Sequence, residues 1–163
     1  MKDKYRQLQY DIAYMKMTYP LAELSYAVRS KVGCVIVSPN GQIVSQGYNG
    51  MPCGMSNKCE YLDNDGNMKT NAEVLHAESN AISKCAKFSS STDEATMYVS
   101  LSPCIECSKL IVQSGIRRVV FGDWYRTTEG IKLLLKAGIK VDYLDVFHHT
   151  IEEITVNDKR LNG

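Results

Sequence analysis

The chain has 163 residues, of which 44% are hydrophobic and 23% charged, the size and composition of one ordinary globular domain. Its 19 basic and 18 acidic residues give a formal net charge of +1, which argues against a nucleic-acid polymer as partner and favours a small substrate. No apolar run approaches the roughly 18 residues that cross a membrane, and the charged start lacks the apolar stretch of a signal peptide, so we expect a cytoplasmic, single-domain protein over residues 1–163.

The first third of the chain shows helical and then strand-like patterns. Apolar residues at helical spacing predict one or two helices up to about Val28, with Pro20 restarting the chain between them. An apolar run from Gly33, turn residues at 38–41 and an alternating stretch at 42–48 predict a β-hairpin. Residues 49–72 are rich in Gly, Asn, Asp and Pro and lack periodicity, which predicts a long loop that is functional or disordered.

From residue 78 onward, predicted helices and strands alternate. Helices are expected over residues 78–88, 103–114 and 127–137, and strands over residues 96–101, 118–122 and 139–146. Such alternation is typical of parallel strands that are connected by helices. We therefore predict an α/β protein in which this part follows the antiparallel hairpin, and a peripheral polar tail from His148.

Three side chains in the body of the chain are candidate ligands of one metal ion: His76, Cys104 and Cys107. His76 and Cys104 each stand at the start of a predicted helix, and a helix-strand-helix unit can bring two such starts side by side. One imidazole and two thiolates are typical of a catalytic zinc site, in which water takes the fourth position. The other two histidines lie in the tail.

The positions of these residues on their helices favour the same chemistry. Cys104 and Cys107 share a helical face, where free N–H groups and the helix dipole favour thiolates. Glu78 lies two residues after His76, a spacing at which a further ligand would point elsewhere. A carboxylate beside the metal can accept a proton from water and pass it on, so Glu78 is the predicted general base and then general acid.

Other interpretations of the cysteines remain open. A Cys-x-x-Cys pair also occurs in thiol oxidoreductases. Cys53 and Cys59 could join Cys104 and Cys107 in a closed four-thiolate site, in a structural module that binds a partner and catalyses nothing. That arrangement leaves Glu78 without a role. The combination of His-Ala-Glu with Pro-Cys-x-x-Cys instead matches the signature of zinc-dependent base deaminases.

Longer segments resemble the deoxycytidylate (dCMP) deaminase family of the cytidine deaminase superfamily, over about residues 20–145. The segments are Gly47-Tyr-Asn-Gly-Met-Pro, His76-Ala-Glu-Ser-Asn-Ala-Ile, residues 95–107 and residues 113–121. The resemblance implies a three-layer α/β/α sandwich around a central five-stranded mixed sheet. It also implies hydrolytic deamination of dCMP to dUMP and ammonia, with Zn²⁺ as cofactor. A tRNA adenosine or single-strand DNA deaminase shares the motif but needs a basic, aromatic-lined channel, which the balanced charge disfavours.

The resemblance also implies contacts to the substrate. Asn49 would hold the sugar 3′ hydroxyl, the backbone N–H of Ala77 would meet the base carbonyl, and the carbonyl of Ser102 would accept from the exocyclic amine. Tyr125 and Arg126 would contact the base and the 5′ phosphate. Simple packing for Tyr125 and a surface charge for Arg126 are the alternatives for these two residues.

Relatives of this kind imply regulation as well. The resemblance implies a homo-hexamer that dCTP activates and dTTP inhibits, with Mg²⁺ on the triphosphate near the hairpin and the long loop. A solvated basic turn and an ordinary loop would explain the same residues equally well. The candidates for this second nucleotide site are Arg29, Ser30, Lys31, Gly50, Glu60 and Asn64. Because no histidine precedes His76, a second zinc ion is not expected.

Overall fold

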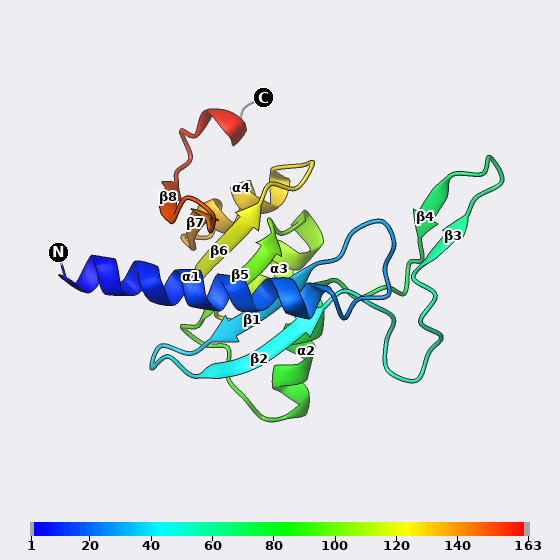
Figure 1. The fold of residues 1–163 in the computed structure, drawn as a ribbon, viewed down its shortest axis with the longest axis horizontal. Coiled ribbons are helices and arrows are strands. Elements are labelled where there is room, and N and C mark those ends of the chain that lie inside the picture. The colour runs from blue at the N-terminus through cyan, green and yellow to red at the C-terminus, as the bar shows by residue number, and fades with distance from the viewer. Residues whose placement is uncertain (1, 162–163) are drawn as a thin grey trace.

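A six-stranded mixed sheet runs through the computed structural model, which describes residues 2–161 (Figure 1). The strand order is β2-β1-β5-β6-β7-β8. The strands are β1 (Gly33–Val37), β2 (Ile43–Tyr48), β5 (Thr96–Leu101), β6 (Arg118–Asp123), β7 (Lys140–Asp145) and β8 (Thr150–Ile154). The helices are α1 (Lys2–Ala22), α2 (Ala77–Lys87), α3 (Ile105–Gln113), α4 (Glu129–Lys136) and a short 3₁₀ helix η1 (Lys159–Leu161).

The direction of the strands follows from the connections between them. β1 pairs antiparallel with β2 through the predicted hairpin and antiparallel with β5 on its other side. β5, β6 and β7 are parallel, as the helices between them require, and β8 pairs antiparallel with β7. The predicted α/β class and the three-layer sandwich are therefore confirmed, but the prediction of five strands in the sheet is wrong.

The sixth strand comes from the segment that was expected to be a peripheral tail. The Asp145 carboxylate accepts hydrogen bonds from the backbone N–H groups of Phe147 and His148, which reverses the chain after β7. Residues 150–154 then pair along β7, although Ile154 is the one buried side chain of β8. A strand that buries so little apolar surface gives no hydrophobic alternation in the sequence.

Each face of the sheet has its own hydrophobic core, because alternate residues of a strand point to opposite faces. Val35 and Val37 of β1 face α1 and pack with Met15, whereas Cys34 and Ile36 face the layer of α2, α3 and α4. α1 is one uninterrupted helix, so the expected break at Pro20 is wrong. Pro20 lies in the last turn, so the one intrahelical hydrogen bond that its missing N–H removes is close to the end of the helix.

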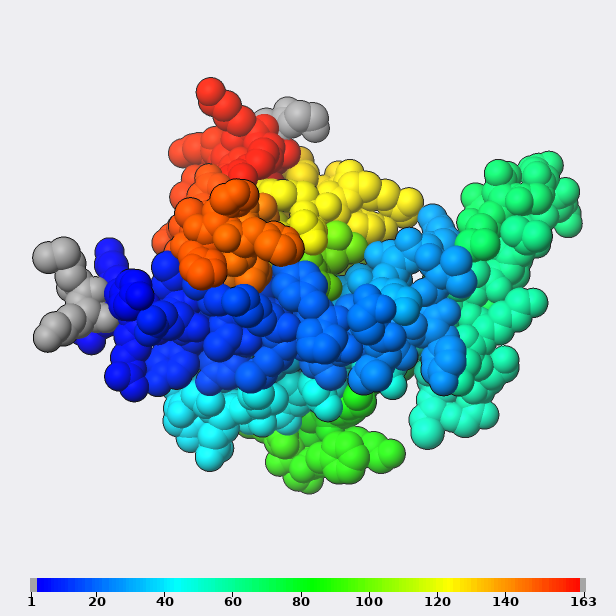
Figure 2. All heavy atoms as spheres, in the orientation of Figure 1, coloured from blue at the N-terminus to red at the C-terminus, as the bar shows by residue number. Residues whose placement is uncertain are grey.

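A second small sheet lies within the predicted loop. β3 (Glu60–Leu62) and β4 (Met68–Thr70) form an antiparallel hairpin that projects from the body (Figures 1 and 2). The Asp63 carboxylate accepts from the N–H groups of Asp65 and Asn67, and Gly66 takes a positive φ of 78° that closes the turn. The segment of residues 49–72, predicted as a long loop, therefore contains a β-hairpin. Within residues 2–161, no helix is long and apolar enough to cross a membrane.

Candidate metal centre and active site

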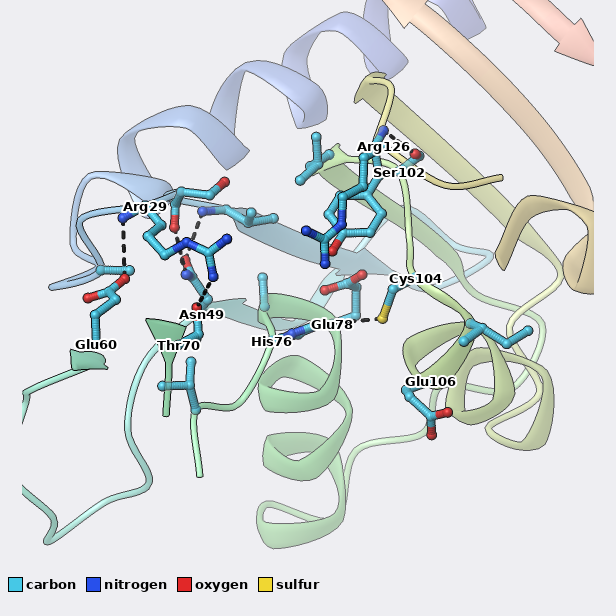
Figure 3. A pocket seen from close by; sticks show the side chains of 18 residues that line it. Arg29, Asn49, Glu60, Thr70, His76, Glu78, Ser102, Cys104, Glu106 and Arg126 are labelled. Atoms are coloured by element: carbon cyan, nitrogen blue, oxygen red, sulfur yellow. Dashed lines mark hydrogen bonds between the residues drawn. The ribbon is translucent and has the colours of Figure 1, made fainter. Parts of the chain in front are cut away.

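The three predicted metal ligands come together at the starts of two neighbouring helices. His76 directly precedes α2, Cys104 directly precedes α3, and Cys107 lies in the first turn of α3. Their donor atoms all lie within 4.8 Å of one another. Because β5 lies between the two helices in the chain, the helix-strand-helix unit produces the expected convergence (Figure 3).

The spacing of the donors fits one tetrahedral zinc ion. The Nδ1 atom of His76 lies 3.5 Å from Sγ of Cys104 and 3.4 Å from Sγ of Cys107. A tetrahedron with Zn–N of about 2.0 Å and Zn–S of about 2.3 Å has N–S edges of about 3.5 Å. Among the residues that the structure describes, this is the one group of three or more potential ligands, and Cys53 and Cys59 do not belong to it. The four-thiolate arrangement is therefore not formed.

Hydrogen bonds stabilise negative charge in this group. The pKa of Cys104 is lowered to about 3, first because the Cys107 thiol donates to it and then because His76 does. The same contact with Cys104, together with burial and the nearby Glu78, raises the pKa of Cys107. The hydrogen bond with Cys104 raises the pKa of His76. A thiolate beside a second thiol and an imidazole is an environment that a divalent cation would stabilise.

Glu78 lies beside the three ligands in the first turn of α2. Its side chain is 4% exposed, and its carboxylate points toward His76 and Cys104 (Figure 3). Burial raises the pKa of Glu78 from its ordinary value, so that this carboxyl group holds a proton closer to neutral pH than an exposed one would. A group of this kind can both accept and donate a proton at the metal centre.

Close packing against β2 fixes the start of α2. A Cβ atom at Gly47 would lie 2.4 Å from the carbonyl oxygen of Ala77, so a side chain there would displace the helix. The Ser45 hydroxyl donates to the Ala81 carbonyl at 2.7 Å, and the Asn80 amide donates to the carbonyl of Tyr48 at 2.9 Å. His76 and Glu78 are thus held at a helix end that cannot shift along the sheet.

A cavity of about 440 Å³ opens above this centre. All five predicted substrate-contacting residues line it: Asn49, Ala77, Ser102, Tyr125 and Arg126. The Tyr125 N–H donates to the Ser102 hydroxyl at 2.7 Å, and the Arg126 guanidinium lies 5.3 Å from the centre of the Tyr125 ring. The loop after β6 is therefore anchored to the loop after β5, beside the metal ligands.

The side chain of Asn49 braces the opposite wall of the cavity. Its Oδ1 accepts from the N–H of Val32 and its Nδ2 donates to the carbonyl of Ser30, both at 2.8 Å. The carbonyl of Asn49 accepts from the Ser25 hydroxyl at 2.6 Å. Asn49 thus holds the irregular segment between α1 and β1 against the cavity.

The six residues predicted for a second nucleotide site do not gather at one place. Arg29, Ser30 and Glu60 line the same cavity as the metal ligands. The other three residues are not among its lining residues: Lys31, Gly50 and Asn64. Lys31 forms an exposed ion pair with Glu23 at 3.2 Å.

Several residues that line the cavity were not predicted from the sequence. Leu101, Ile105 and Glu106 directly flank the Ser-Pro-Cys motif, so proximity along the chain could have identified them. No local pattern marks the others, because they come from separate segments of the chain that only the fold brings together. These are Ala27, Val32, Thr70 and Val74.

Two guanidinium groups at this cavity lack an acidic partner. Within residues 2–161, no carboxylate oxygen lies within 4.0 Å of the guanidinium nitrogens of Arg29 or Arg126. The cavity therefore combines a candidate metal centre, a buried carboxylate and two unneutralised positive charges.

Comparison with known proteins identifies the family of this chain. The pattern of the cytidine and deoxycytidylate deaminase zinc-binding region matches residues 8–123. The chain belongs to this family. It is 33% identical to the deoxycytidylate deaminase of Enterobacteria phage T4 over 166 positions, which cover 78% of this chain and 86% of the relative. It is 38% identical to the deoxycytidylate deaminase of Mus musculus over 140 positions, covering 81% and 78% of the two chains.

A solved structure of the family is also similar in fold. The dCMP deaminase from the cyanophage S-TIM5, in complex with dCMP and dUMP, superposes with a TM-score of 0.76 at 40% identity. The match covers 88% of this chain and 99% of that protein. The family that the sequence resembles and its enzymatic nature are therefore confirmed.

Proposed function

We propose that this protein, as one domain over its whole length, hydrolyses dCMP to dUMP and ammonia. The observation that carries the proposal is the metal-ligand group of His76, Cys104 and Cys107 beside the buried Glu78, at a cavity with two unpaired guanidinium groups. The similarity to a cyanophage enzyme solved with dCMP and dUMP supports this choice of substrate.

The donor set fits Zn²⁺, held by His76, Cys104 and Cys107. When bound, zinc supplies a Lewis acid that lowers the pKa of a coordinated water to about 7. Glu78 accepts a proton from the attacking water and delivers it to N3 of the pyrimidine. Water adds at C4, Glu78 passes a proton to the leaving amine, and dCMP and water become dUMP and ammonia.

Contacts at the edge of the base orient the pyrimidine for this reaction. In our proposal the Ala77 N–H donates to the base carbonyl, and the Ser102 carbonyl accepts from the exocyclic amine. Asn49 holds the 3′ hydroxyl, and its bonds to the segment around Ser30 keep it in place. Tyr125 lies against the base. The location of all five predicted contact residues around one cavity supports these roles.

The 5′ phosphate is assigned to Arg126 and Arg29. Both line the cavity, and no carboxylate in the described part of the chain neutralises either of them. A guanidinium binds phosphate with two parallel N–H donors, which makes unpaired arginines at a cavity typical of phosphate sites. The enzyme would therefore prefer a nucleotide to a nucleoside.

The test is ammonia release from dCMP, cytidine and a single-stranded oligonucleotide by the zinc-loaded protein. We expect turnover of dCMP above the other two. Turnover of the oligonucleotide alone would instead identify a polymer deaminase, and no turnover at all would favour a metal-binding module.

We also propose the regulation that the resemblance implies. dCTP with Mg²⁺ would activate the enzyme and dTTP with Mg²⁺ would inhibit it, in a homo-hexamer. Arg29, Ser30 and Glu60 line the catalytic cavity, so in our proposal a triphosphate that binds next to the cavity acts on the substrate site through these residues. Rates on dCMP with each triphosphate, and the mass in solution, test this proposal. Rates that neither triphosphate changes would contradict it.

A further inference from the structure

The base of the β3–β4 hairpin holds Arg29 from two sides. Glu60 begins β3, Thr70 ends β4, and the two are direct partners in the strand register. Oε1 of Glu60 accepts from the backbone N–H groups of Val28 at 3.0 Å and Arg29 at 3.2 Å. The Thr70 hydroxyl accepts from Nη1 of Arg29 at 3.0 Å (Figure 3). One residue pair therefore fixes both the backbone and the side chain of Arg29.

The same hydrogen bonds also attach the β3–β4 hairpin to the segment that contains Val28 and Arg29. The hairpin projects from the body of the molecule (Figure 2). Within residues 2–161, every hydrogen bond that joins residues 60–70 to another part of the chain ends on Val28 or Arg29. The position of the hairpin and the position of Arg29 are thus linked.

The burial of Glu60 points to a specific task. Glu60 is 8% exposed. Among the described residues, no cationic side chain lies within ion-pair distance of its carboxylate. A buried carboxylate is costly unless hydrogen bonds compensate it, and here two backbone N–H groups do so. A residue needed for packing alone would be apolar.

The contact with Thr70 leaves most of the Arg29 guanidinium available. The group has five N–H donors in a rigid fork, and one nitrogen is engaged by Thr70. The remaining donors belong to a side chain that lines the cavity. A long, exposed arginine loses side-chain freedom when it binds an anion, and holding it beforehand reduces that cost.

We propose that Glu60 and Thr70 are positioning residues, which hold Arg29 in the orientation that binds the 5′ phosphate and so set the preference for nucleotide over nucleoside. This inference rests on the proposed function. Glu60 and Thr70 also line the cavity, but in this proposal they act through Arg29 and not through the base. Their loss therefore affects a substrate that carries a phosphate and spares one that does not.

The experiment compares kcat/KM for dCMP and for deoxycytidine in the full-length zinc enzyme. Arg29→Ala is expected to lower kcat/KM for dCMP by about tenfold to hundredfold, the effect of one charge-assisted contact, and to change that for deoxycytidine by less than about twofold. Glu60→Ala is expected to cause a similarly selective loss. The double variant is expected to lose no more than Arg29→Ala alone, because both changes remove one interaction.

Three further variants serve as controls. Glu60→Gln keeps an acceptor oxygen at the same place and should lose less than Glu60→Ala. Thr70→Val removes only the bond to Nη1 and should lower kcat/KM for dCMP selectively by a few-fold; it carries the test if Glu60→Ala does not fold. Glu73→Gln changes an exposed carboxylate between the hairpin and His76 and should leave both rates unchanged.

If deoxycytidine is turned over too slowly to measure, dissociation constants for dUMP and deoxyuridine replace the rates, with the same selective loss expected. Equal losses for both substrates in folded Glu60→Ala and Thr70→Val, or losses that multiply with that of Arg29→Ala, would overturn the inference. A wild-type enzyme without activity on dCMP would contradict the proposed function instead.

Discussion

Arginine side chains in two regions of this molecule differ in whether a carboxylate of the protein neutralises their charge. At the interface of α1 and the sheet, Arg118 donates to the carboxylates of Asp11 at 2.8 Å and Asp142 at 2.6 Å, and Tyr98 donates to Asp11 at 2.7 Å. At the cavity, Arg29 and Arg126 have no acidic partner among the described residues. The first environment satisfies its charge within the protein, and the second leaves charge for a ligand.

The difference shows in the pKa of Asp11, although not in that of Asp142, which burial raises even though Arg118 acts to lower it. Burial acts to raise the pKa of Asp11, but the hydrogen bonds and charge of Arg118 outweigh it, so that the pKa is lowered overall. Burial raises the pKa of Glu78 with no arginine beside it. One buried carboxylate is therefore fixed as an anion for stability, whereas the other can exchange a proton. We expect substitutions in the two regions to affect stability and activity separately.

Among variants that keep the metal ligands, the largest effect is expected from Glu78→Ala. Loss of the proton-transferring carboxylate should lower kcat on dCMP by about 10²–10⁴-fold, because general acid–base catalysis contributes that much. The melting temperature should not fall, since a buried charged group is removed. Steady-state kinetics, zinc content and a thermal melt check this. Unchanged kcat with full zinc content would identify a binding module rather than an enzyme.

Loss of a metal ligand should abolish both metal binding and activity. Cys104→Ala removes one of three donors, and we expect purified protein with little zinc and no turnover of dCMP. Cys53→Ala is the matched control, because Cys53 is an exposed cysteine outside the ligand group. Elemental analysis and the dCMP assay distinguish the two variants. Equal zinc loss in both would favour a four-thiolate site.

Breaking the interior arginine network should reduce stability instead. Arg118→Met leaves Asp11 and Asp142 buried without their cationic partner, which costs about 3–5 kcal/mol of unfolding free energy. Arg117→Met, next to it in the chain, removes an exposed pair with Glu94 and should hardly change the melt. Urea unfolding measures both. If folded Arg118→Met loses activity selectively on dCMP, the separation of the two regions is wrong.

The smallest effect is expected from Arg126→Ala. Loss of one phosphate contact should raise KM for dCMP by about tenfold and leave the melting temperature unchanged. Arg6→Ala is a close control, because Arg6 also lies over a tyrosine ring, at 5.6 Å, but outside the cavity. Kinetics of the two variants at constant salt make the comparison. Equal changes in KM would rule out a specific role for Arg126.

The sequence carried more information about the metal centre than about the cavity walls. His76, Cys104 and Cys107 stand at helix starts in short motifs, so spacing and element order were enough to bring them together. β5 and β6 contain both β-branched and aromatic residues and were predicted almost to the residue. Glu60 and Thr70 contact Arg29 although they lie 31 and 41 residues after it in the chain, and no local periodicity encodes such a contact. Because the sequence did not indicate these long-range contacts, Arg29, Ser30 and Glu60 were predicted for a second nucleotide site, whereas they line the catalytic cavity.

The ligands of the zinc ion test the proposed function most directly, and X-ray absorption at the zinc edge of the loaded protein measures them. We predict two sulfur atoms at about 2.3 Å and two nitrogen or oxygen atoms at about 2.0–2.1 Å, as expected for His76, Cys104, Cys107 and water. A shell of four sulfur atoms, or one without sulfur, would contradict the proposed centre.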